Sequence, residues 1–365
     1  MVAASPHATL SPSLYVATST VNAATQQRGI ATSPTPRSHE NPLGLPRNNQ
    51  RIPPTMPRRG SGVPAPRAIP NVKRVVCVSS GKGGVGKSTV ASNLAVAFAQ
   101  LSSLPPRRVG LLDLDIFGPS VPKLMGLEGM GEPELTPSGA LVPMKSHGVS
   151  CMSMGFLLGN SGSQEEREDK VVAWRGMMVM KATQQLLFDV DWRLDPSAPV
   201  QQPASGSGTS DNDGLDVLVI DMPPGTGDVA LSLSQLVKVD GGVVVTTPQE
   251  IALLDAKKGM AMFRKTSVPI SGLVVNMSHF VSPDTGRSFA IFGSLDRVEA
   301  YAVKERLDIL ARIPVQPLLS AAGDAGAPLT LRERITIDEM TNVGIPNLVR
   351  ATFLDLAQNI WNKVA

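Results

Sequence analysis

Residues 81–89 hold glycines, a lysine and hydroxyl side chains at a spacing that suits the phosphates of a nucleotide. The pattern G-x-x-x-x-G-K-[ST] is satisfied by Gly81, Gly86, Lys87 and Ser88. Glycines let the backbone curl so that successive N–H groups point at an anion, while Lys87 can reach the outer phosphates and the Ser88 hydroxyl can ligate Mg²⁺. The predicted phosphate-binding residues are Gly81, Lys82, Gly83, Gly84, Val85, Gly86, Lys87, Ser88 and Thr89.

Carboxylates follow two other apolar runs of the chain. Asp113 and Asp115 come directly after one run, and Asp221 ends another. Because open α/β sheets bind ligands beyond the carboxyl ends of their strands, we expect these acids to lie near the phosphate loop. An apolar strand that ends in a single aspartate is typical of a Walker B site, whose carboxylate holds Mg²⁺ through a water.

The elements that must position these residues alternate between short apolar runs and helical patterns. We predict strands at 75–78, 109–112, 215–220, 242–246, 272–276 and 309–314, short strands within a loop at 126–150, and helices from Thr89, over 174–192 and over 346–361. Such alternation indicates an α/β fold with a mostly parallel central sheet and helices on both faces, as in a three-layer P-loop NTPase.

The last predicted helix has an apolar stripe formed by Val349, Phe353, Leu356 and Ile360. A helix lying on a membrane surface is one interpretation. Only Arg350 and Lys363 supply cations there, however, so packing against the core is the favoured one. No apolar run in the sequence is long enough to span a membrane.

The composition divides the chain of 365 residues into two regions. Residues 1–72 carry seven arginines, no lysine and one acid, so their net charge is +6, and residues 73–365 sum to −3. We interpret residues 1–70 as disordered with a mitochondrial transit peptide, although a plain disordered tail has a similar composition. Residues 71–365 are predicted to form one ATPase domain with a flexible inserted loop at 195–214. The net negative charge of this domain argues against a nucleic-acid partner.

The two cysteines, Cys77 and Cys151, exclude a disulfide scaffold and a four-cysteine metal site within one chain. Each lies in an apolar stretch. Both are therefore predicted to be small buried side chains rather than ligands.

Several segments together resemble the Mrp/ApbC-type ATPases, which are scaffold and carrier proteins of iron–sulfur cluster assembly. The segments that carry the resemblance are GKGGVGKST, LLDLDIFGPSVPKLMG, CMSMGF, AWRGMMVMKATQQLLFDVDW, VLVIDMPPGTGDVALSLSQ and TTPQEIALLDAKKGMAMF. The early segment HENPLGLPR is similar to the mitochondrial branch, which supplies respiratory complex I. The resemblance covers about residues 39–330, apart from the insert at 195–214, and implies ATP and Mg²⁺ as cofactors and iron–sulfur apo-proteins as clients. The composition of the N-terminal region predicts the mitochondrial matrix as location.

The resemblance also implies roles for individual residues. Lys82 marks the deviant Walker A group, in which this lysine reaches the partner's nucleotide across a homodimer. Asp115 matches the residue that orients or activates the attacking water. The residues matched to magnesium are Ser88, Asp113 and Asp221, those matched to the second switch loop are Gly225 and Asp228, and the one matched to an adenine contact is Asn276.

One segment departs from the family pattern. Where the family has a C-P-x-C pair that holds a bridging [4Fe–4S] cluster between two subunits, this chain has Ser282 and Thr285. Hydroxyls are poor iron ligands, so no iron–sulfur ligands are assigned. An unusual set that includes His279 and Asp284 remains an alternative.

The expected function is an ATP-hydrolysing scaffold or carrier of mitochondrial iron–sulfur assembly that serves respiratory complex I, with Ser282 and Thr285 in place of the usual cluster cysteines. One alternative is a nucleotide-gated assembly factor that binds no cluster. Others are a partition-type ATPase that positions its cargo on membrane or DNA, and a small-molecule kinase on a related fold.

Overall fold

The computed structural model describes residues 66–101, 106–116, 118–157, 176–193, 213–282, 284–331 and 344–365. The predicted transit peptide lies outside these ranges. So does the predicted inserted loop, except for its last two residues. The proposed division into a disordered region and a single domain therefore stays a prediction.

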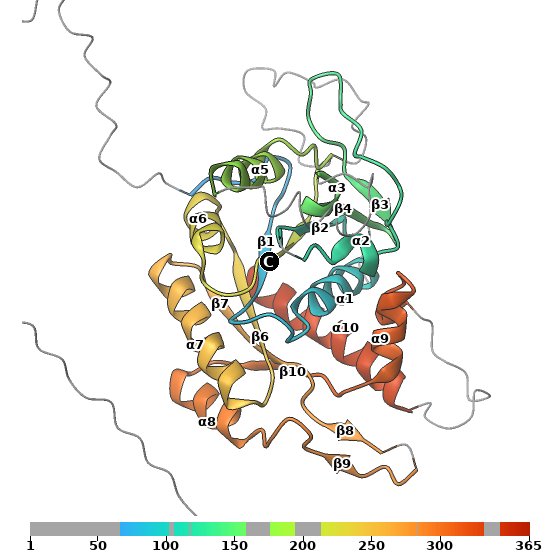
Figure 1. Ribbon diagram of the computed structural model, residues 1–365, viewed down its shortest axis with the longest axis vertical. Coiled ribbons are helices and arrows are strands. Elements are labelled where there is room, and N and C mark those ends of the chain that lie inside the picture. Colours follow the sequence, from blue (N-terminus) through green and yellow to red (C-terminus); the bar gives the residue numbers. More distant parts are fainter. Residues whose placement is uncertain are drawn as a thin grey trace, which may run out of the picture. The chain divides into compact units, whose positions relative to one another are not determined.

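Eight strands form a sheet in the order β10-β7-β6-β1-β5-β2-β4-β3 (Figure 1). Only the pairing of β3 with β4 is antiparallel within it. This mostly parallel sheet confirms the predicted α/β class. The strands are β1 (Val75–Ser80), β2 (Val109–Asp113), β3 (Met144–Ser146), β4 (Val149–Ser153), β5 (Val217–Asp221), β6 (Gly241–Thr246), β7 (Ile270–Val275) and β10 (Ile309–Arg312), and a separate hairpin contains β8 (Phe280–Val281) and β9 (Ser288–Phe289).

Helices cover both faces of the sheet, as the sequence pattern predicts. Gly241 and Gly242 are adjacent in β6 and so point to opposite faces. A side chain on Gly241 would approach Val364 of α10, whereas one on Gly242 would approach Phe263 of α7. The helices are α1 (Lys87–Gln100), α2 (Val121–Leu124), α3 (Met154–Leu157), α5 (Gly176–Phe188), α6 (Asp228–Leu236), α7 (Glu250–Lys265), α8 (Asp296–Glu305), α9 (Pro317–Asp324) and α10 (Gly344–Val364), with a 3₁₀ turn at Leu329–Leu331.

Several strands run further into polar sequence than their apolar patterns predict. β1 continues to Ser80, which pairs with Val245 of β6. β2 and β5 include their terminal acids, because Asp113 and Asp221 are register partners in the sheet. Backbone hydrogen bonding to neighbouring strands thus extends the strands to the point where the chemistry begins.

The terminal helix packs on the core. Val349, Phe353, Leu356 and Ile360 are all fully buried, which confirms core packing rather than a membrane-surface face. Helix α10 lies beside α1 (Figure 1), and the Trp361 ring meets Phe98 edge-on, with 6.4 Å between centroids. Of the helices in the described ranges, none combines the length and hydrophobicity needed to cross a bilayer.

Candidate functional site

The phosphate loop joins β1 to α1 in a conformation that requires glycine. Gly84 and Gly86 have φ angles of 82° and 83°, which L side chains rarely adopt. A Cβ on Gly86 would lie 2.2 Å from the Asn276 side-chain nitrogen. A Cβ on Gly81 would lie 2.0 Å from the backbone of Asp255 in α7. The motif glycines are therefore dictated by backbone geometry and by neighbours that are distant in sequence.

A cavity of about 340 Å³ opens over this loop. It contains most of the predicted phosphate-binding residues together with Asp115. Its described lining consists of Ser80, Lys82, Gly83, Gly84, Gly86, Lys87, Ser88, Thr89, Asp115, Gly118, Ser120, Leu124 and Pro224. Sequence reasoning did not single out Ser80, Gly118, Ser120, Leu124 or Pro224. The polar GPS run after Asp115 was the available signal for two of them.

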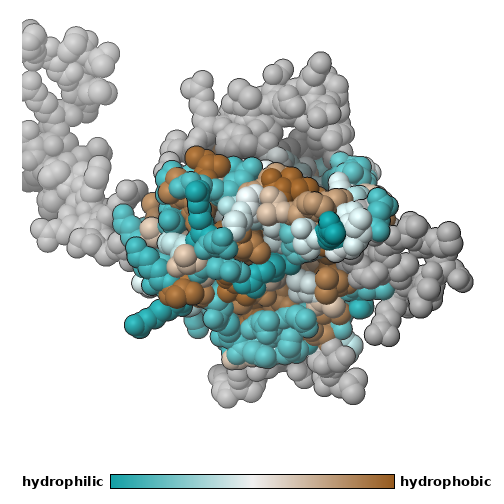
Figure 2. Space-filling model, turned by 90° about the horizontal axis from the view of Figure 1, so that it is seen from below, coloured by the Kyte–Doolittle hydropathy of each residue, from teal (hydrophilic) through white to brown (hydrophobic). Residues whose placement is uncertain are grey.

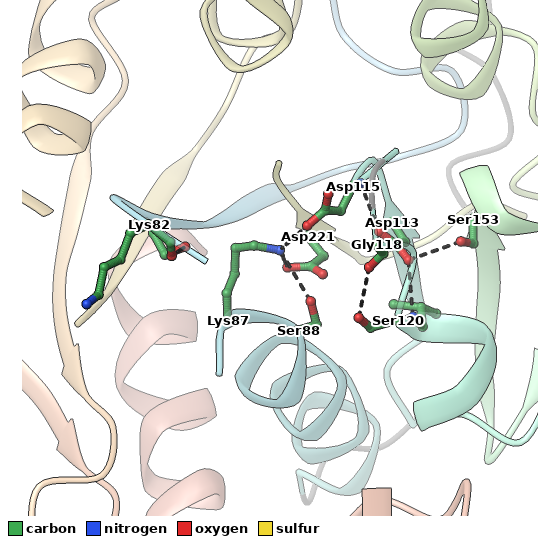
Figure 3. Close-up of polar contacts among 11 residues, drawn as sticks. Lys82, Lys87, Ser88, Asp113, Asp115, Gly118, Ser120, Ser153 and Asp221 are labelled. Atoms are coloured by element: carbon green, nitrogen blue, oxygen red, sulfur yellow. Dashed lines mark hydrogen bonds and ion pairs between the residues drawn. The ribbon is translucent and has the colours of Figure 1, made fainter. Parts of the chain in front are cut away.

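Lys87 connects the loop to the predicted acids. Its ammonium donates to Asp221 Oδ1 at 2.7 Å and lies 3.6 Å from Asp115 Oδ2 (Figure 3). It also donates to the Ser88 hydroxyl at 3.3 Å. The lysine is 6% exposed and Asp221 is fully buried. The structure thus brings together four of the predicted site residues, which come from three separate segments.

The charged groups at this site shift the pKa values of Lys87 and Asp113. Burial alone would lower the pKa of the Lys87 ammonium, but the charge and hydrogen bond of Asp221, with contributions from Asp115 and Asp113, raise it above its ordinary value. Burial, followed by the charge of Asp221, raises the pKa of Asp113 to about 7. The cluster therefore has a strongly held cation that an incoming phosphate can attract.

The Asp113 carboxylate accepts three hydrogen bonds, two from backbone N–H groups and one from a hydroxyl. Its Oδ1 accepts from the Asp115 backbone N–H at 2.9 Å, and its Oδ2 accepts from the Val121 N–H at 3.1 Å and the Ser153 hydroxyl at 3.0 Å. Its predicted role around Mg²⁺ stays a prediction. What the structure adds is that Asp113 organises the segment that carries Asp115.

Lys82 extends away from Lys87 (Figure 3). Its carbonyl accepts a hydrogen bond from the Ser80 hydroxyl at 2.9 Å, which ties the loop entrance to the end of β1. The two motif lysines of the loop thus point in different directions. Lys87 turns toward Asp115 and Asp221, whereas Lys82 does not.

The predicted second switch loop begins beside the phosphate loop. The Gly225 N–H donates to the Ser80 carbonyl at 2.9 Å, and a Cβ on Gly225 would lie 3.8 Å from the Gly81 carbonyl. Gly225 has a φ of 83°, so glycine suits this turn. Asp228 is the first residue of α6. A direct backbone contact therefore links the two predicted nucleotide-binding segments.

Asn276 lies behind the phosphate loop at the end of β7. Its side-chain N–H donates to the Val85 carbonyl at 2.8 Å, and it is 5% exposed. The predicted adenine contact stays a prediction. The observed bond shows that Asn276 supports the loop backbone directly.

The segment with Ser282 and Thr285 forms the turn of the β8–β9 hairpin. The Ser282 N–H donates to the Arg287 carbonyl at 2.9 Å, and the Gly286 N–H donates back to the Ser282 carbonyl at 2.9 Å. Figure 2 views the molecule from the end that carries this hairpin in Figure 1, and hydrophobic patches lie there among larger hydrophilic areas. Backbone hydrogen bonds thus close the hairpin at Ser282, and the chain has hydroxyls at two positions where the family pattern has thiols.

Comparison with known proteins shows the family of this chain. Residues 71–196 and 208–345 match the ParA family profile described as NUBPL iron-transfer P-loop NTPase. The chain belongs to this family. The NUBPL-type assignment confirms the resemblance found in the sequence.

Two curated relatives and one solved structure are similar to this NUBPL-type chain. The mouse "Iron-sulfur cluster transfer protein NUBPL" is 44% identical over 272 residues, covering 74% of this chain and 75% of its own. The Arabidopsis thaliana "Iron-sulfur protein required for NADH dehydrogenase, mitochondrial" is 39% identical over 289 residues, covering 79% and 78%. A nucleotide-binding protein from Archaeoglobus fulgidus in complex with ADP has a TM-score of 0.54 and 31% identity, covering 70% of this chain and 87% of its own.

The residues of the site fit a magnesium ion held beside a nucleotide. Asp221 Oδ2 is buried without a hydrogen-bond partner among the described residues, and a lone carboxylate oxygen there suits a metal-bound water. The Ser88 hydroxyl lies near the same ammonium. Mg²⁺ is usually held by one or two protein oxygens together with phosphates and waters, so this small donor set suffices.

The residues do not fit an iron–sulfur cluster. Cys77 and Cys151 are fully buried free thiols, as predicted, and burial raises the pKa of each thiol far above its ordinary value. A thiol in such a place resists forming the thiolate that binds iron. Within the described residues, no group of three or more His, Cys, Asp or Glu could hold a metal ion.

Proposed function

We propose that this protein is an ATP-hydrolysing factor of iron–sulfur assembly in the mitochondrial matrix, serving respiratory complex I. The observation that carries this proposal is the cluster of Lys87, Asp115 and Asp221 at the phosphate loop. The names of the mouse and Arabidopsis relatives support a role in iron–sulfur assembly, and the Arabidopsis name supports the link to NADH dehydrogenase. The arginine-rich, acid-poor N-terminal composition supports the compartment.

The proposed mechanism is transfer of the γ-phosphoryl group to water. Lys87 would exchange part of its contact with Asp221 for the outer phosphates, and the loop N–H groups would hold the remaining oxygens. Ser88 and Asp221 would hold Mg²⁺, which neutralises phosphate charge when bound. Asp115 would orient a water in line with the bond to ADP and accept its proton, and that bond would break as the new P–O bond forms.

Replacing Asp115 tests the hydrolytic step. We expect Asp115→Asn to bind ATP and Mg²⁺ with unchanged affinity and to hydrolyse ATP about 100-fold more slowly, because an amide cannot accept the water's proton. Titration calorimetry and phosphate release measure the two properties. An ATP affinity that falls as much as the rate would instead assign Asp115 to ground-state binding.

The proposed working unit is a homodimer with nucleotide between the subunits. Lys82 turns away from the acids around Lys87 (Figure 3), so a function on its own subunit's γ-phosphate would require the side chain to reorient. A phosphate presented by a second copy offers a partner for this cation. The dimer also accounts for the second lysine of the motif.

Lys82→Ala is expected to retain ATP binding but to lose ATP-dependent dimerisation and most of the hydrolysis. Sedimentation velocity with and without ATP measures the association. Lys238→Ala is the matched control, since this exposed lysine precedes β6 at the end of the sheet away from the loop. Dimerisation that persists in Lys82→Ala, with unchanged turnover, would contradict the shared-nucleotide arrangement.

A second candidate is an assembly factor that works through nucleotide-gated partner binding and carries no cluster. Ser282 and Thr285 favour this candidate, because the hairpin turn offers two hydroxyls in place of thiols. In this candidate, a [4Fe–4S] cluster is cargo of other proteins in the process. ATP binding and hydrolysis would be the same in both candidates.

A further inference from the structure

The segment CMSMGF, residues 151–156, has no role in the mechanism above. It contains the end of β4 and most of α3. Ser153 is the last residue of β4, is fully buried and pairs in register with Asp113 of β2. Residues 151–156 therefore contact the segment that carries Asp113 and Asp115 directly, at the carboxyl edge of the sheet.

The Ser153 hydroxyl has a defined place in a hydrogen-bond chain. It donates to Asp113 Oδ2 at 3.0 Å (Figure 3). It also accepts from the Gly155 N–H at 3.0 Å. A hydroxyl has one proton to donate, and Gly155 uses the oxygen as an acceptor. The serine proton is therefore directed at Asp113, in a fully buried place where water cannot replace it.

Asp113 in turn joins the two ends of the segment between β2 and α2. The N–H of Asp115 lies near one end of that segment, and the N–H of Val121 lies at the other. One carboxylate thus holds both ends, and its orientation sets where Asp115 stands relative to Lys87. Without Ser153, the carboxylate would lose one of its three observed donors and could rotate about its side-chain torsions.

Residues 151–156 also pack tightly against the chain between β2 and α2. A Cβ on Gly155 would lie 3.1 Å from Pro119 and 3.0 Å from Pro122. Gly155 therefore allows the start of α3 to approach the loop and α2 closely. Contact and hydrogen bonding both connect residues 151–156 to the segment that carries Asp115.

We propose that Ser153 is a positioning residue of the ATPase site, which holds the Asp113 carboxylate so that it fixes the Asp115 segment. The expected effect of Ser153 on kcat rests on the proposed ATP hydrolysis. The fixing of the segment itself is a property of the nucleotide-free protein. Ser153 contacts neither the phosphates nor the water in this mechanism and acts through Asp113.

Hydrogen exchange of the full chain without nucleotide tests the positioning. In Ser153→Ala, the Asp115 and Val121 amides should exchange about tenfold faster than in the wild type, because a lost hydrogen bond to a carboxylate corresponds to at least that factor. Ser153→Thr retains the hydroxyl and should restore slow exchange. Ser150→Ala, which removes a hydroxyl from the same strand, should leave both amides unchanged.

Steady-state kinetics supply the second readout. We expect Ser153→Ala to lower kcat for ATP about tenfold with KM changed less than twofold, and Ser153→Thr to recover kcat. A variant that only weakened the fold would not lower the kcat of the folded protein while leaving its KM nearly unchanged and recovering with threonine. If Ser153→Ala does not fold, Ser153→Cys takes its place, because it preserves the size but donates only a weak hydrogen bond.

Two outcomes would overturn the proposal. The first is unchanged exchange at both amides in a folded Ser153→Ala protein, whatever happens to hydrolysis. The second is a folded Ser153→Thr protein that behaves like the alanine variant, because size and not the hydroxyl would then matter. A wild-type protein that binds but does not hydrolyse ATP would refute the proposed function, and the exchange result would still decide the role of Ser153.

Discussion

Replacing Lys87 with alanine is expected to weaken ATP binding by at least about 100-fold, which places it below detection in a calorimetric titration. The variant removes the cation that would contact the outer phosphates. It also leaves Asp115, which lines the pocket, and the buried Asp221 beside it without the ammonium that now lies between them. Two uncompensated carboxylates would repel a polyphosphate, so the loss exceeds that of a single contact.

The matched control for this prediction is Lys73→Ala. Lys73 precedes β1 at the end away from the phosphate loop, is 43% exposed in its side chain and pairs with Asp216 at 3.4 Å. It carries the same charge as Lys87 and should leave ATP affinity unchanged. Circular dichroism establishes that both variants are folded. Wild-type affinity in a folded Lys87→Ala protein would refute the nucleotide site.

Replacing Ser282 and Thr285 together with cysteine is expected to create an iron–sulfur site that the wild type lacks. The two positions belong to the β8–β9 hairpin, which is closed by backbone hydrogen bonds between Ser282 and both Arg287 and Gly286. Two copies would supply four thiolates, the usual ligand number of a [4Fe–4S] cluster. We expect about four irons per dimer and a broad visible absorption after anaerobic reconstitution.

The wild type and the two single variants are the controls for this gain. The wild type should hold no stable cluster, because its cysteines are buried and resist ionisation. Each single variant supplies only two thiolates per dimer and should lose iron on desalting. A cluster in the wild type would mean that other residues serve as ligands. An inert double variant would mean that the turns of two copies do not meet.

The fold class and the phosphate loop could be predicted from sequence because both depend on local patterns. Short apolar runs alternating with helical periodicity specify a buried parallel sheet, and the glycines of the motif permit the positive φ angles observed at Gly84 and Gly86. The ends of the strands were less predictable. Ser80 and Asp113 belong to strands because their neighbours pair with them, which no apolar pattern reveals.

The order of chemical groups along the chain, including the hydroxyls at Ser282 and Thr285, can be read from the sequence. Which of these groups meet depends on the folding of the whole domain. Asn276 supports the Val85 carbonyl from 191 positions away, and Lys87 reaches Asp221 across 134. Such contacts arise because parallel strands bring their carboxyl ends to one edge of the sheet whatever their separation in the chain. Side-chain direction at that edge depends on packing from all neighbouring elements, which local patterns do not encode.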